Sequence, residues 1–148
     1  MSKSESSTAV PTRHIHDNCL CLHAQRAARA LARRFDEAFR PFGITSGQFS
    51  LLNAMNREEP RSMGEVAAIL AMDRTTLTAN LKPLERQGLM KSAVDPNDRR
   101  SRKLVLTAAG KKRLRAAAPV WKREHAALER ELAAIDADAL RAGLRAIA

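Results

Sequence analysis

Aromatic residues are scarce in this chain of 148 residues, at 3% of the total, and tyrosine is absent. Proteins that bind single-stranded nucleic acid stack its bases on aromatic side chains, so this scarcity argues against that class. Long apolar runs are also missing, because no segment approaches the roughly 20 apolar residues that cross a bilayer. The serine-rich start, residues 1–12, lacks the apolar core of a signal peptide. We expect no membrane association, and a disordered tail over 1–12.

Cysteine and acidic residues are few as well. The two cysteines, Cys19 and Cys21, lie too close in sequence to build a disulfide framework, which favours a cytoplasmic protein with free thiols. Aspartate and glutamate number 16 against 26 lysines and arginines, and the net charge of +10 favours a polyanionic partner. No nucleophile–base pair, phosphate-binding loop or carboxylate pair stands out, so we expect neither an enzyme nor a cofactor.

Alanine, leucine and arginine dominate what is present, and apolar residues recur at three- and four-residue steps, which predicts mostly helices. Capping boxes at Thr45–Gln48 and Ser62–Glu65 mark two helix starts, and Asp73 and Thr107 cap two more. We expect helices over 16–39, from 45 toward Pro60, over 63–70, 74–87 and 108–135, and from Asp136 or Asp138 onward. The helix over 108–135 has an apolar seam with heptad spacing, which suits a partner helix.

A basic hairpin is predicted between the last two long helices. Two short apolar runs, 89–94 and 104–106, flank the turn-forming residues 95–98. The returning side of the hairpin is basic, at Arg99, Arg100, Arg102 and Lys103. Phosphates attract such a hairpin, and arginine fits a narrow minor groove, so this segment favours binding to a nucleic-acid groove. The alternative is an ordinary solvated run of charges.

The helix over 74–87 follows a short helix and a tight turn, which is the order of a helix–turn–helix. Its leucines face inward and leave an outward row of polar residues, which are Arg74, Thr75, Thr76, Thr78, Asn80 and Lys82. A recognition helix reads the major groove with such side chains. We expect Arg74 to bind guanine, the threonines to meet phosphates or a thymine methyl, and Lys82 to hold a phosphate. The alternative is an exposed polar helix face.

With these elements in place, the chain resembles the MarR family of bacterial transcription regulators from about Asp17 to its end. The matching segments are 42–45 with 48–49, 72–78, 84–89, 95–101, and 104–107 with Gly110. The resemblance implies a mainly α fold with a small β-hairpin wing (α+β), built as a winged helix–turn–helix. It divides the chain into a dimerisation and ligand-pocket helix (13–44), a DNA-binding domain (45–107) and C-terminal dimerisation helices (108–148).

The resemblance also implies a function. It points to a homodimer that binds double-stranded DNA at a pseudo-palindromic operator and acts as a repressor released by a small molecule or by oxidation. Arg100 matches the arginine that enters the minor groove, and Asp98 would brace it. A pocket for a small aromatic or lipophilic effector would take residues from Arg26, Phe35, Phe39, Phe49 and Trp121. A less favoured alternative is a protein-binding module that uses the wing without operator specificity.

The cysteines near the start of the first helix allow three interpretations. Cys21 is a buried small hydrophobe in the structural one. In the redox one, Cys21 matches the reactive cysteine of the organic-hydroperoxide regulators in this family, with Cys19 as a second thiol. In the metal-binding one, His16, Cys19 and His23 share one helix face at i, i+3 and i+7. The sequence leaves all three open.

Overall fold

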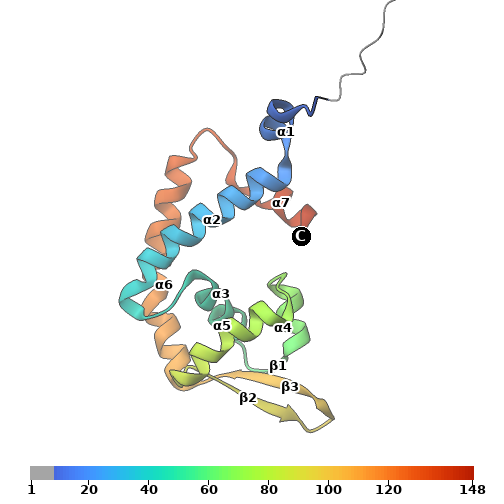
Figure 1. Ribbon diagram of the computed structural model, residues 1–148. Coiled ribbons are helices and arrows are strands. Elements are labelled where there is room, and N and C mark those ends of the chain that lie inside the picture. The colour runs from blue at the N-terminus through green and yellow to red at the C-terminus, as the bar shows by residue number, and fades with distance from the viewer. Residues whose placement is uncertain (1–8) are drawn as a thin grey trace, which may run out of the picture. The chain divides into compact units, whose positions relative to one another are not determined.

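The computed structural model describes residues 9–148, and these fall into two compact units that divide after Leu31 (Figure 1). The elements in chain order are α1 (Thr12–Asn18), α2 (Leu20–Phe39), the 3-10 helix η1 (Arg40–Phe42), α3 (Ser46–Ala54), β1 (Arg61–Ser62), α4 (Met63–Ile69), α5 (Arg74–Arg86), β2 (Met90–Asp95), β3 (Asp98–Leu106), α6 (Ala108–Glu131) and α7 (Ala137–Ile147). The structure is therefore mostly helical with a small sheet, as predicted. No helix among residues 9–148 is long and apolar enough to span a bilayer.

The start of the chain differs from the single helix predicted over 16–39. Residues 1–8 of the predicted tail lie outside the described residues, and α1 already begins at Thr12. The extended backbone of Cys19 (φ −72°, ψ 106°) separates α1 from α2. Its thiol accepts a hydrogen bond from the backbone N–H of Leu22 at 3.4 Å, which caps the first turn of α2. Apolar periodicity continues across this break, so the sequence pattern alone does not show it.

The later helix ends follow the predicted caps. The side chains of Thr45, Ser62, Asp73 and Thr107 each accept a backbone hydrogen bond from their own helices, and the first two form complete capping boxes. Asp136 caps α7, which settles the alternative between Asp136 and Asp138. The predicted helix over 108–135 was too long at its end, because the chain must leave helical geometry before the extended Asp136 (ψ 107°).

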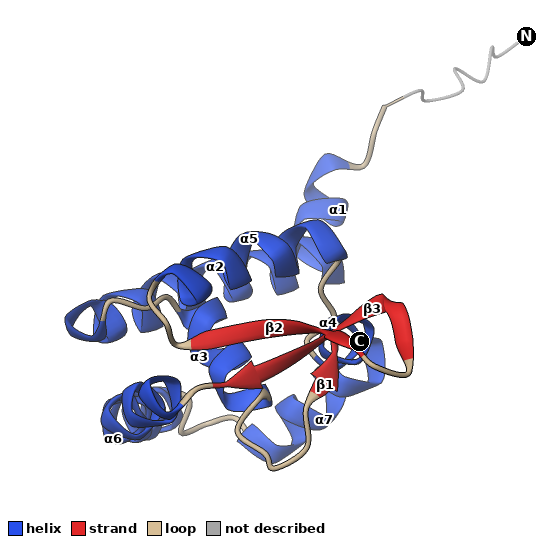
Figure 2. Cartoon of the chain, turned by 90° about the horizontal axis from the view of Figure 1, so that it is seen from below, coloured by secondary structure: helices blue, strands red, loops and turns tan. Residues whose placement is uncertain are grey.

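The sheet has three antiparallel strands in the order β1–β3–β2 (Figure 2). The predicted hairpin is confirmed, and its basic residues lie on the returning strand, β3, as expected. The short strand β1 was missed, since two residues carry no periodicity. The ladder is irregular near the tip: Val94 pairs with Arg102 and Asp95 with Asp98, so residues 99–101 have no partner on β2. Such a bulge redirects side chains.

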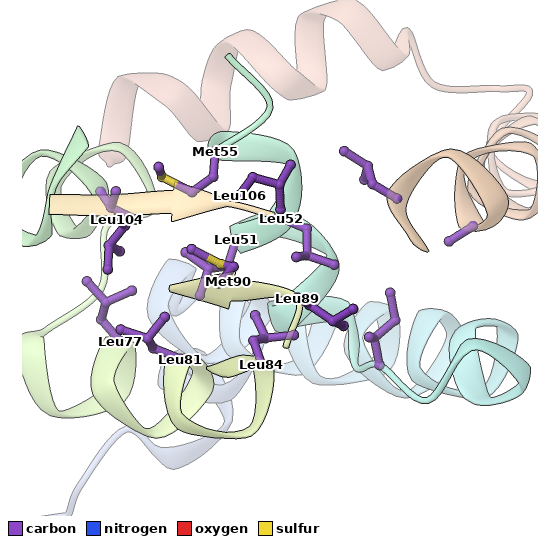
Figure 3. Packing of buried hydrophobic residues seen from close by; sticks show 14 of the residues in the cluster. Leu51, Leu52, Met55, Leu77, Leu81, Leu84, Leu89, Met90, Leu104 and Leu106 are labelled. Carbon is purple, nitrogen blue, oxygen red and sulfur yellow. The ribbon is translucent and has the colours of Figure 1, made fainter. Parts of the chain in front are cut away.

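The core lies where α3 and α5 meet the sheet, as Figure 3 shows. The side chains of α5 at its centre are Leu77, Leu81 and Leu84, as predicted, and all are buried. They pack with α3 and the strands through Leu51, Leu52, Met55, Leu89, Met90, Leu104 and Leu106. Burial of a leucine side chain contributes roughly 1.5–3 kcal/mol. This cluster holds α5 in a fixed position against the sheet.

The C-terminal part of α2 is attached to α6 by one arginine. Arg34 donates to Glu124 at 3.1 Å and to both carboxylate oxygens of Glu131 at 2.8 and 3.0 Å. These hydrogen bonds raise the pKa of Arg34 and lower that of Glu131. The pair of carboxylates fixes where the end of α6 lies along α2.

Candidate nucleic-acid interface

The first turn of α5 is fixed by its own cap. Asp73 accepts hydrogen bonds from the backbone N–H of Thr76 at 2.8 Å and from its hydroxyl at 2.9 Å. These two bonds hold the pKa of Asp73 below its usual value. Thr76, one of the predicted DNA-binding residues, therefore has its hydroxyl proton engaged within the helix.

Two further predicted residues, Thr78 and Asn80, donate hydrogen bonds within α5. The Thr78 hydroxyl donates to the carbonyl of Arg74 at 2.8 Å, and the Asn80 amide donates to the carbonyl of Thr76 at 3.0 Å. Asn80 also lies against the start of α3, because a Cβ on Gly47 would be 3.1 Å from its Oδ1. Within residues 9–148, the side chains of Arg74, Thr75 and Lys82 make no hydrogen bond or ion pair. A shallow depression of about 380 Å³ on this face is lined by Arg74, Thr75, Thr78, Ala79 and Lys82.

The hairpin tip is held by two aspartates in different ways. Asp95 is almost fully buried, accepts the backbone N–H of Asn97 at 2.9 Å and lies 3.9 Å from Lys103. Asp98 accepts the backbone N–H of Arg100 at 3.0 Å. The ion pairs of the described residues do not include Asp98 with the Arg100 guanidinium, so the contact seen fixes the strand backbone at Arg100. Asp95 was predicted as a turn residue of the hairpin, but its contacts with Asn97 and Lys103 were not.

A notch of about 380 Å³ separates α5 from the hairpin, and both elements line it. Its lining residues are Met63, Gly64, Arg74, Thr78, Asp98, Arg100, Ser101 and Arg102. Three guanidinium groups and one carboxylate therefore surround one hollow. The sequence had pointed to five of these residues but not to Met63, Gly64 or Ser101. The fold brings these three in from the start of α4 and from the bulge of β3. Arg99 and Lys82, also predicted, are exposed but do not line the notch.

The predicted effector residues separate into two groups. Phe39 is 1% exposed, its ring lies 4.5 Å from that of Phe49 and 5.9 Å from that of Phe35, and it belongs to the core. Phe49 also lines a cleft of about 670 Å³ between α3, α4 and α6, together with Trp121, Ile69 and the cations Lys111 and Arg115. Trp121 is 40% exposed and stacks on His125 at 4.9 Å. Arg26 lies on α2 in the N-terminal unit.

Of the three interpretations of the cysteines, the one that buries Cys21 as a small hydrophobe does not hold within the single chain. Its side chain is exposed, and its sulfur accepts a hydrogen bond from the Gln25 amide at 3.4 Å. The break at Cys19 also removes the continuous helix face on which the metal interpretation rested. His23 Nδ1 lies 2.8 Å from the Cys19 carbonyl, and residues 9–148 contain no cluster of three or more His, Cys, Asp or Glu placed to hold a metal.

The capped helix α5 and the tip of the hairpin lie in a segment that matches a known family. The model of the MarR family matches residues 42–101. The chain is also similar to the M. tuberculosis transcriptional regulator MosR, which was solved in complex with DNA. The two are 35% identical with a TM-score of 0.78, and the match covers 87% of this chain and 92% of that chain. The chain belongs to the MarR family. Members of this family are transcription regulators and not enzymes.

Two further comparisons place this MarR protein among its relatives. The repressor CouR, solved on a 23-mer DNA duplex, is 30% identical, with 90% of this chain and 94% of that chain covered and a TM-score of 0.77. The regulator TtmR of Methylorubrum extorquens is 33% identical over 64% of this chain and 49% of its own length. The matched regions span between 49% and 64% of the length of the curated relatives.

Proposed function

We propose that this MarR protein is a cytoplasmic repressor that binds a pseudo-palindromic DNA operator as a homodimer. The observation that carries the proposal is the notch, where α5 and the hairpin present three arginines to one hollow. A recognition helix in the major groove with a basic hairpin beside it suits double-stranded DNA. Two similar regulators, MosR and CouR, were solved with DNA, which supports the same partner here.

The apolar face of α7 supports the homodimer. None of its residues is buried, and Leu140, Leu144 and Ile147 are all exposed, as is Ile135 just before it. An exposed apolar face of this kind marks a protein–protein interface. A second copy of α7 and the seam of α6 would cover it, and would place the two α5 helices about one turn of DNA apart.

A release signal is proposed at one of two places. The cleft of about 670 Å³ between α3, α4 and α6 lies in the usual size range of ligand pockets and has an aromatic wall, which suits a small aromatic or lipophilic effector. The alternative is oxidation of Cys21, which the exposure of its thiol favours. Release by peroxide that a Cys21→Ser variant resists would decide for the second.

The test of the DNA function is fluorescence anisotropy on a duplex that the protein selects from a randomised pool, with a scrambled duplex as control. If each lobe neutralises about four phosphates, the logarithm of the binding constant should fall with the logarithm of the salt concentration at a slope of about −7 for the dimer. Tight and selective binding at one dimer per site is the expected result. A slope shallower than about −2, or equal binding to both duplexes, would contradict the proposal. Salt-sensitive binding to an acidic protein with no preference for DNA sequence would favour the protein-binding alternative.

A further inference from the structure

We propose that Arg74 anchors a backbone phosphate of the DNA in the notch between α5 and the hairpin, and does not read a base. This inference rests on the proposed DNA function and changes the role first predicted for Arg74, which was pairing with guanine. It divides the polar residues of α5 into those that position the helix on the duplex and those that face base edges.

The geometry of the duplex limits what the notch can hold. Each phosphodiester strand separates the major groove from the minor groove. A helix in the major groove and a hairpin in the adjacent minor groove must therefore lie on opposite sides of one strand. The hollow between α5 and β3 is the place left for that strand, so a side chain that stays within the hollow lies beside phosphates and sugars. Base edges lie deeper in the grooves, on either side of it.

The Arg74 side chain lines the notch. A Cβ on Gly64 would be 3.6 Å from Arg74 Nη2, so the guanidinium extends over the start of α4, on the notch side of α5. Arg100 and Arg102 line the same notch from β3. Three cations around one hollow with a single carboxylate, Asp98, give it a net positive charge that suits an anion such as a phosphate.

The polar residues of α5 differ in their angular position around the helix axis. At about 100° per residue, Arg74 and Thr78 lie together on the edge that borders the notch. Asn80 lies on the opposite edge, against Gly47 of α3. Thr75 lies between the two edges, opposite the buried leucines, and faces outward. Arg74 and Thr78 also border the outer depression, but from the edge nearer the notch. Thr75, at the centre of the outward face, is therefore better placed than Arg74 to face the floor of the major groove.

The experiment measures the binding of three variants to the selected duplex and to the scrambled duplex by anisotropy at several salt concentrations. Arg74→Ala removes the proposed anchor, and Arg74→Lys keeps the charge but not the bidentate fork that reads guanine. Arg86→Ala is the matched control, because it removes the same charge from the last turn of the same helix, about 18 Å along the axis. Arg74 and Arg86 are both exposed, so circular dichroism should show that all three variants are folded.

We expect Arg74→Ala to weaken binding to both duplexes by the same factor, about tenfold or more, and to leave their affinity ratio unchanged. The salt slope should become shallower by about two, one phosphate for each subunit. Arg74→Lys should keep most of the affinity, and Arg86→Ala should change it less than about twofold. Replacing single phosphates by neutral methylphosphonates should reveal one position in each half-site that weakens the wild-type protein and not Arg74→Ala.

Three results would overturn the inference. If Arg74→Ala lowers affinity for the selected duplex to that of the scrambled one and leaves the scrambled duplex unaffected, Arg74 reads a base. If neither duplex is affected, Arg74 does not anchor a phosphate. If the wild-type protein binds neither duplex, the proposed DNA function fails, and the role of Arg74 fails with it. The first two results would overturn the role of Arg74 alone and leave the DNA function standing.

Discussion

Two helices of this protein carry apolar residues at the same spacing, i, i+4 and i+7, with opposite results. Those of α5 are Leu77, Leu81 and Leu84. Those of α7 are Leu140, Leu144 and Ile147. The first three are at most 5% exposed, whereas the second three are between 42% and 71% exposed. The spacing thus defines an apolar face but not what covers it: the chain itself covers α5, and we propose that a second copy covers α7.

The largest effect, a loss of folding stability, is expected from shortening a side chain on the buried face of α5. Leu77→Ala should lower the free energy of unfolding by about 2–5 kcal/mol, because it opens a cavity in a core that cannot fully collapse. Lys82→Ala, on the exposed face of the same helix, should change it by less than about 0.5 kcal/mol. Urea unfolding at one fixed protein concentration measures both. Equal losses in the two variants would show that α5 is not seated by its leucines.

A second contrast uses two glycines, Gly110 in the first turn of α6 and Gly143 in α7. A Cβ at Gly110 would lie against the backbone carbonyl of Leu89 and the side chain of Leu106, whereas nothing lies within 4 Å of one at Gly143. Gly110→Ala should therefore destabilise by about 1–3 kcal/mol or more through overpacking. Gly143→Ala should stabilise α7 by up to about 1 kcal/mol through helix propensity. Thermal unfolding of both variants gives the comparison, and a neutral Gly110→Ala would mean that α6 does not pack closely on Leu89.

The uncovered face of α7 is tested by a charge placed on it. Leu144→Asp should shift the protein toward a slower-sedimenting species in analytical ultracentrifugation, because a buried unpaired carboxylate disfavours association. Ala142→Asp places the same charge on the opposite face of α7 and should leave sedimentation unchanged. Identical sedimentation of Leu144→Asp and the wild-type protein would rule out α7 as the dimer interface.

The smallest effect is expected from the cap of α5 and depends on pH. The pKa of Asp73 is lowered in the folded state, so its carboxylate stabilises the fold above its ordinary pKa of 3.8. That contribution is lost as the pH falls through the lower folded pKa. The melting temperatures of the wild-type protein and Asp73→Asn should differ most above about pH 4 and converge in stronger acid. A difference that does not change with pH would contradict the role given to this carboxylate.

Local signals predicted most of the fold. The helix starts capped by Thr45, Ser62, Asp73 and Thr107 were predicted correctly, because the cap and its partner lie within three residues. The cap of α7, Asp136, was one of two candidates. The break at Cys19 was missed because a thiol cap is a rare signal and the apolar pattern continues through it. The strand β1 was missed because its pairing with β3, at Arg61 with Leu104, joins distant parts of the chain.

In the candidate interface, too, local patterns identified residues but not the contacts between distant parts of the chain. Arg74 and Arg100 were each identified from local patterns, but their convergence on one notch depends on the packing of α4, α5 and β3. The roles of Gly64 and Ser101 follow only from that packing. Hydroxyl and amide groups such as those of Thr76 and Asn80 were predicted to face DNA from their helix positions. Their bonds to the helix itself become visible only with coordinates.

The most direct test of the account joins its two regions, since α5 would read each half-site and α7 would fix their spacing. Anisotropy should compare the selected duplex with one that has about five extra base pairs between its half-sites, which turns one half-site by about half a helical turn. The account predicts that affinity for the lengthened duplex falls toward that of the scrambled control. Equal affinity for the two duplexes would contradict binding by a dimer with two lobes held at a fixed distance.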